Sequence, residues 1–287
     1  MTMILTELKD LIATTIRVWK LDHAARMGAA LAFYLTTSVI PMAILSLIIL
    51  GNVMGPSAAE GQVHLSLSAA LGEETARFIE NLVLSAARPG GGTAALFGIF
   101  ILALMASNMF HHIRNSLDVL WGVRGRQAPL KTFLIGRWIS VLLILGVQLI
   151  LLALFAVGIL ASSVIPIIIS WFPSQVGFLT QVAYDTIIFV EVFLLVCAIY
   201  WLLARAQLQW RVIVAGAAFT SFLFIIGKYL LALGLSISNI ASIYGAFGSL
   251  LILLLWFFYI AQIFYLGAEF TKVYSDRIQR SGSETNS

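Results

Sequence analysis

Charged residues are scarce in this chain of 287 residues: 10% are Asp, Glu, Lys or Arg, whereas 61% are hydrophobic. A soluble globular domain carries about 25% charged residues, so this composition is typical of a membrane protein and argues against a water-soluble enzyme. The single cysteine, Cys197, lies in an apolar run, which excludes an intramolecular disulfide framework.

Motifs for catalysis and metal binding are also missing. The sequence has no Gly-rich phosphate loop, no HExxH, no GxSxG and no Cys/His ligand set. The adjacent His111 and His112 would point about 100° apart on a helix and cannot easily share a metal ion. A nucleic-acid-binding protein would need its basic residues clustered on one accessible face. We therefore expect no catalytic residues, no metal, no cofactor and no nucleic-acid partner.

The chain instead contains long runs without a charged residue. These runs matter because a helix needs about 20 apolar residues to cross a bilayer. The run from residue 138 to 184 would give a helix of about 70 Å, so it must turn, and Pro166, Trp171 and Pro173 mark the turn. Six spans result, at about residues 28–53, 93–110, 133–165, 178–204, 212–235 and 244–270. We predict an all-α, polytopic integral membrane protein whose six-helix domain covers residues 28–271.

The basic residues fall on one side of this predicted domain. The N-terminal segment, the second and fourth connections with their flanks, and the C-terminal tail together hold 14 of the 17 Lys and Arg residues. Short cytoplasmic loops carry such an excess of positive charge. Both termini are therefore predicted to be cytoplasmic.

Three segments lie outside the spans. Residues 1–27 alternate apolar and polar side chains at helical spacing, which predicts an amphipathic helix either in the membrane interface or packed against the cytoplasmic end of the bundle. The outer loop, residues 55–92, contains a second amphipathic pattern. The cytoplasmic tail is residues 272–287, and its polar end, residues 281–287, is expected to be disordered. The first apolar run is too long for a cleaved signal peptide.

Ionisable residues inside spans point to function, because burying a charge without a partner is costly. Asp185 and Lys228 lie at matching depth in the fourth and fifth spans, so we predict that they interact, either as a structural ion pair or as part of a gate or substrate site. Glu191, nearer the midplane, either carries a proton or is a neutral residue hydrogen-bonded to a neighbouring helix. Glu269 is explained by an interfacial pair with Lys272, three residues later.

Several motifs resemble the YihY/BrkB family of bacterial inner-membrane proteins, once described as ribonuclease BN-like. They are GAALAFY at residues 28–34 with Pro41 beyond it, LDVLWGV at 117–123, YGAFGSL at 244–250 and LGAE at 266–269. The resemblance implies a six-helix protein of the bacterial inner membrane, a transporter for a lipid-like or envelope-related substrate. It does not bring a catalytic motif for a ribonuclease.

These observations give a set of candidate residues. Substrate or transport candidates are Asp185, Glu191, Lys228, Tyr34, Thr37 and Pro41, the last of which should kink the first span. Candidates at the cytoplasmic end are Asp118, Glu269, Arg114 and Arg124. The basic rim there predicts contact with anionic lipid headgroups. The competing hypotheses are a non-transporting membrane scaffold or envelope-integrity protein and, least favoured, a membrane-bound ribonuclease; the sequence sets no oligomeric state.

Overall fold

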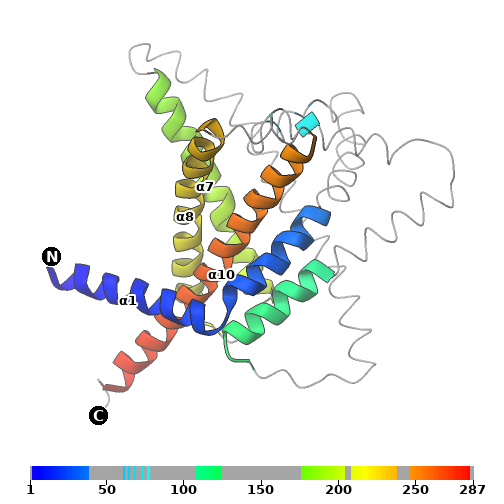
Figure 1. The fold of residues 1–287 in the computed structure, drawn as a ribbon. Helices are drawn as coiled ribbons and strands as arrows, with labels where there is room; N and C mark the ends of the chain where they lie inside the picture. The colour runs from blue at the N-terminus through cyan, green and yellow to red at the C-terminus, as the bar shows by residue number, and fades with distance from the viewer. Residues whose placement is uncertain are drawn as a thin grey trace.

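The computed structural model describes residues 2–38, 108–123, 176–203, 208–237 and 246–284, with a few individual positions between residues 61 and 77. Four helices have defined bounds: α1 (Thr2–Leu21), α7 (Val176–Leu203), α8 (Trp210–Ile237) and α10 (Ala246–Glu284). Residues 24–38 and 108–120 are helical as well. The described part of the chain is thus all-helical, as predicted (Figure 1).

Three of these helices are long and apolar enough to cross a membrane. The candidate spans are Gln181–Leu203 in α7, Trp210–Leu231 in α8 and Leu251–Arg280 in α10. They correspond to the predicted spans 178–204, 212–235 and 244–270. The predicted spans 93–110 and 133–165 lie outside the described residues, apart from 108–110, and residues 39–53 of the first span do so too.

The C-terminal helix is longer than its apolar sequence suggested. Helix α10 continues to Glu284 and so includes residues 281–284 of the segment that was expected to be disordered, while residues 285–287 lie outside the described residues. Apolar content indicates where a helix can leave the hydrocarbon region, but it does not set where the helix ends. The N-terminal helix docks on α10 before this extension, at residues 270–277.

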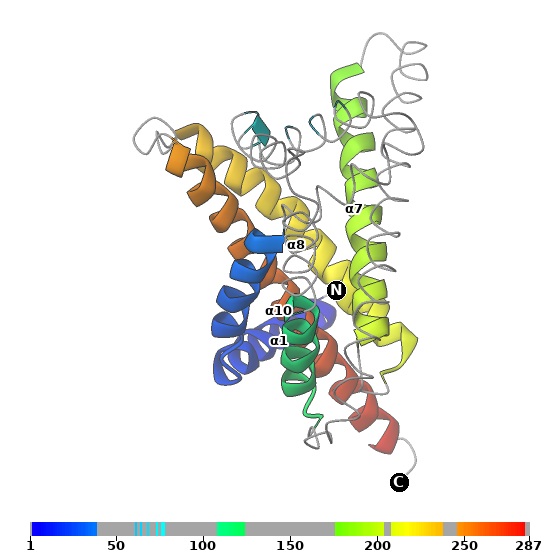
Figure 2. The same ribbon diagram turned by 90° about the vertical axis from the view of Figure 1, so that its right-hand side faces the viewer.

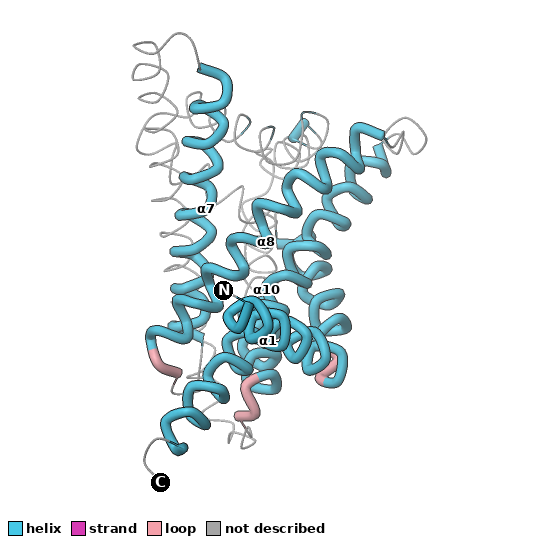
Figure 3. Tube along the Cα trace, turned by 90° about the vertical axis from the view of Figure 1, so that its left-hand side faces the viewer, coloured by secondary structure: helices cyan, strands magenta, loops and turns pink. Residues whose placement is uncertain are grey.

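Helix α1 packs across this lower part of α10 (Figures 1 and 3). Leu11 of α1 forms a small buried cluster with Phe270 and Val273 of α10. The guanidinium of Arg277 donates a hydrogen bond to the carbonyl of Glu7, at 3.2 Å. Of the two alternatives for the N-terminal amphipathic segment, the helix packed against the bundle is the one the contacts support.

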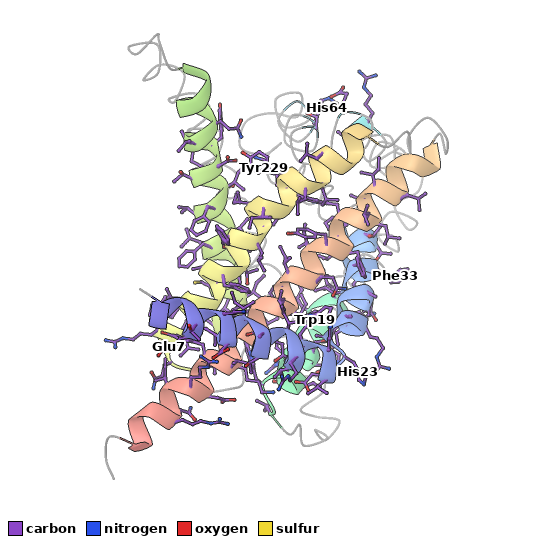
Figure 4. The ribbon with its side chains drawn as sticks, turned by 60° about the vertical axis from the view of Figure 1, so that its left-hand side comes forward. Glu7, Trp19, His23, Phe33, His64 and Tyr229 are labelled. Atoms are coloured by element: carbon purple, nitrogen blue, oxygen red, sulfur yellow. The ribbon has the colours of Figure 1, made fainter. Side chains whose placement is uncertain are left out.

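The chain then turns sharply and forms the helix of residues 24–38, which runs beside the upper half of α10 (Figure 4). His23 adopts a φ of 54°, in the left-handed region that breaks a helix, and the peptide NH of Arg26 donates to the carbonyl of His23 at 2.9 Å. We call the turn at Asp22 and His23 the elbow.

The core lies where residues 24–32, 109–121, 196–203 and 213–217 meet α10 at residues 261–268. The indole NH of Trp121 donates to the carbonyl of Ala268 at 3.0 Å, and the Tyr200 hydroxyl donates to the carbonyl of Phe264 at 2.6 Å. The rings of Trp121 and Tyr200 meet edge to face, 5.8 Å apart. Gly267 lets α8 approach, because a Cβ there would collide with the hydroxyl of Thr220.

Candidate functional site

A polar network joins α7 and α8, two helices that are otherwise strongly apolar. The ammonium of Lys228 lies 3.1 Å from Oδ1 of Asp185, so the predicted interaction between them is confirmed. The Tyr229 hydroxyl donates a hydrogen bond to Oδ2 of the same carboxylate. The side-chain amide of Gln181 lies 3.4 Å from both carboxylate oxygens and 2.9 Å from the Tyr229 hydroxyl. We call these four residues the α7–α8 network.

The network lies in the part of the molecule where α7 and α8 diverge, and Tyr229 lies between the two helices (Figures 2 and 4). Side-chain exposure is 22% for Asp185 and 32% for Lys228. The Lys228 ammonium also lies 5.5 Å from the centre of the Tyr229 ring, within range of a cation–π interaction. Asp185 therefore has three donors, and its partner cation has a second contact.

Gln181 and Tyr229 were not among the residues predicted from the sequence to have a role. One signal was present, because Gln181 precedes Asp185 by four residues and so shares its face of the helix. Tyr229 follows Lys228 directly, and only the crossing of the two helices shows that both reach the same carboxylate.

Glu191 lies six residues beyond Asp185 on α7, about 9 Å along the helix axis. Its side chain is half-buried, and its buried Oε1 atom has no hydrogen-bond partner among the described residues. The alternative in which Glu191 is hydrogen-bonded through this oxygen to a described helix is therefore not observed.

Glu269 is the most deeply buried of the predicted candidates that the structure describes, with no exposed surface. The predicted pair with Lys272 is wrong, because the Lys272 ammonium contacts Asp22 of the elbow instead, at 3.4 Å. Neither carboxyl oxygen of Glu269 has a hydrogen-bond donor among the described residues. Its charged neighbours are Lys272 and Asp22. Asp22 was missed because 250 residues separate it from Lys272 in the chain.

The candidates in residues 24–38 have contacts that account for them structurally. Thr37 donates its hydroxyl to carbonyls of its own helix, those of Phe33 and Tyr34, at 3.0 and 3.1 Å. The Tyr34 ring packs on the ring of His112, with centroids 5.3 Å apart. Pro41 lies outside the described residues, so the predicted kink stays a prediction.

Two further candidates at the predicted cytoplasmic end, Arg114 and Asp118, lie on residues 108–123. Asp118 is buried and Arg114, one turn earlier, is half-buried, while Arg124 lies outside the described residues. The Nε2 atom of His112 lies 3.0 Å from the carbonyl of Met27, whereas His111 is exposed. Within the part of the chain that the structure describes, no three His, Cys, Asp or Glu side chains are grouped so as to hold a metal ion.

Comparison with known proteins places the chain in a family. Residues 15–287 match the family described as Virulence factor BrkB. Neither the curated proteins nor the solved structures contain a match. The match covers nearly the whole chain, including the elbow, the core around α10 and the α7–α8 network. Together with the three long apolar helices, it shows that this chain is a membrane protein of the BrkB family.

Proposed function

We propose that this protein is a transporter, a permease or flippase-like protein, for a lipid-like or anionic amphiphilic envelope substrate. In this proposal it crosses the bacterial inner membrane six times with both termini in the cytoplasm, acts without a cofactor, and is neither an enzyme nor a nucleic-acid-binding protein. Its partners are membrane lipids, whose anionic headgroups bind the basic cytoplasmic rim.

The observation that carries the proposal is the set of polar side chains on α7 and on the part of α8 that faces it. Asp185 of α7 pairs with Lys228 of α8 and has Tyr and Gln partners. Six residues later on α7, the carboxyl group of Glu191 has a buried oxygen with no partner among the described residues. Ionisable groups within spans are expensive to keep, and in transporters they mark the path of ions or substrate. An anionic headgroup has the charge needed to compete with Asp185 for Lys228, and Glu191 is placed to carry a proton.

The proposed cytoplasmic end has the features of a membrane boundary. Trp201 and Trp210, at the facing ends of α7 and α8, are 62% and 59% exposed, and Arg211 beside them is exposed. Tryptophan and arginine favour the headgroup region. The topology can be tested with single cysteines at Ser68 and Ser283 in a Cys197→Ser background. Impermeant reagent should label them from opposite sides of the membrane, and labelling from one side would refute the map.

Transport is tested with purified protein in vesicles, by following the movement of a fluorescent phospholipid with an anionic headgroup. Wild type should accelerate the movement, and Glu191→Gln should slow it at least tenfold while thermal unfolding stays unchanged. Glu73→Gln, in the predicted outer loop, is the matched control and should transport like wild type. Unchanged transport by folded Glu191→Gln would remove the proton-carrying role.

A membrane scaffold is the second candidate, and the close packing of α8 on α10 favours it. At Gly216 and Gly227 a Cβ atom would collide with Thr271 and Tyr259, so the two helices are in near contact along much of their length. A folded wild-type protein that moves neither anionic nor zwitterionic lipid would support the scaffold over the transporter.

A further inference from the structure

Helix α10 holds the N-terminal segment at three places. The Gln262 amide donates to the carbonyl of Ala25 at 3.1 Å, Lys272 contacts Asp22, and Arg277 donates to the carbonyl of Glu7. Glu269 lies on α10 between the first two of these contacts. Any change at Glu269 is therefore made at the point where the elbow is attached to α10.

The charges around Glu269 do not balance if every group is ionised. Two carboxyl groups, those of Asp22 and Glu269, share one cation, Lys272, and the cation contacts Asp22. Glu269 itself is fully buried and receives no hydrogen bond from the described residues. An ionised carboxylate in such a place, without its own donors, is strongly disfavoured.

No other described group corrects the balance. Further ionisable side chains lie on α10 itself and on the elements packed around it: on α1, the elbow and residues 24–38 they are Glu7, Lys9, Asp10, Arg17, Lys20, His23, Arg26 and Tyr34, and on the other described helices and α10 they include His111, His112, Arg114, Asp118, Cys197, Tyr200, Arg211 and Tyr265. None of them acts on Glu269, whose electrostatic neighbours are Lys272 and Asp22. Lys272 lies three residues after Glu269 on α10 and contacts Asp22 at 3.4 Å, so the two carboxyl groups lie beside the same cation. Two carboxyl oxygens form a hydrogen bond when one of them carries a proton.

We propose that Asp22 and Glu269 share one proton, and that this proton-binding site, completed by Lys272, keeps the elbow and α1 docked on α10. In the docked state Glu269 donates its proton to the Asp22 carboxylate, which also accepts from Lys272. On deprotonation the proton leaves to water past Asp22, whose side chain is 30% exposed. The Glu269 carboxylate then takes Lys272, and Asp22 is released from α10.

The first test detects the proton itself by infrared spectroscopy of the protein in lipid at neutral pH. Glu269→Gln should remove one component of the protonated-carboxyl C=O band. Glu73→Gln should leave the band unchanged, because Glu73 is exposed and paired with Arg77. Asp22→Asn should also remove the component, because Lys272 is then free to pair with Glu269. A band that persists in either folded variant would overturn the proposal.

The second test measures docking. Spin labels on cysteines replacing the exposed Lys9 of α1 and Asp276 of α10, in a Cys197→Ser background, report the distance between the two helices. With rising pH, wild type should change from one narrow distance distribution to a broad one. Glu269→Gln should stay narrow throughout, and Glu191→Gln should titrate like wild type. Identical titration of wild type and Glu269→Gln would show that the site does not control the elbow.

Discussion

Two acidic side chains in apolar helices, Asp185 and Glu269, have opposite environments. Asp185 has Lys228, Tyr229 and Gln181 as donors and is 22% exposed. Glu269 has no donor among the described residues and no exposure. A carboxylate with a full set of charge-assisted hydrogen bonds is stable as an anion, whereas one without donors is stable when neutral. Burial alone therefore does not assign a role to an acidic residue within a span; its burial and its donors together do.

The largest expected effect on stability comes from removing the cationic donor of Asp185, which makes its environment more like that of Glu269. Lys228→Met removes the cation and leaves the carboxylate with the weaker donors Tyr229 and Gln181. Lys228→Met leaves an unpaired charge within a predicted span, which costs about 3 kcal/mol or more and should appear as a lower free energy of unfolding in lipid or detergent. Asp185→Asn combined with Lys228→Met removes both charges and should restore most of that loss.

The double variant tests whether the charges of Asp185 and Lys228 are coupled. If the single and double variants unfold alike, the two charges are not coupled, and the α7–α8 network does not stabilise the helix pair. If folding is restored but lipid movement is not, the same pair also acts in transport.

A smaller effect on stability is expected at Gly267, where α8 and α10 approach closely beside Glu269. Gly267→Ala places a methyl group against the Thr220 hydroxyl and 2.9 Å from the Tyr200 hydroxyl, so α8 and α10 must separate or Thr220 must turn. Overpacking of this kind costs about 1–3 kcal/mol. Gly61→Ala is the control, because a Cβ there meets nothing within 4 Å. Equal thermal stability of the two variants would contradict the close approach.

The contrast also shows which features the sequence was able to predict. The length of the apolar runs predicted the ends of α7 and α8 to within two residues, because the thickness of the bilayer limits the length of a span. Depth counted from the span ends brought Asp185 and Lys228 together, since a rise of about 1.5 Å per residue converts position into height. These are properties of single helices, and a sequence contains them.

What the sequence did not reveal depends on contacts between distant segments. The pairing of Glu269 with Lys272 looked sufficient because both are on α10, three residues apart. In the structure the Lys272 ammonium contacts the Asp22 carboxylate instead. Asp22 lies on the elbow, whose position depends on how α1 packs. In the same way, nothing near Trp121 in the chain indicates that its indole NH bonds to Ala268, 147 residues away.

The smallest effect is expected at an exposed carboxylate, Glu73, which has donors but no burial. The Arg77 guanidinium donates to it at 2.9 Å, and this hydrogen bond lowers the pKa of the Glu73 carboxyl from its ordinary value. A lowered pKa in the folded state gives a stabilisation that is complete above the ordinary pKa and is lost as the pH falls through the folded value.

Arg77→Gln should therefore raise the Glu73 pKa toward its ordinary value, measured by NMR titration of carbon-13-labelled glutamate. The thermal midpoint should change less than for Lys228→Met or Gly267→Ala, because water screens an exposed pair. A change as large as that of Lys228→Met would mean that hydrogen-bond donors alone, without burial, determine what a carboxylate contributes. Asp185 and Glu269 would then differ because of their hydrogen-bond donors only, and burial would not contribute to the difference.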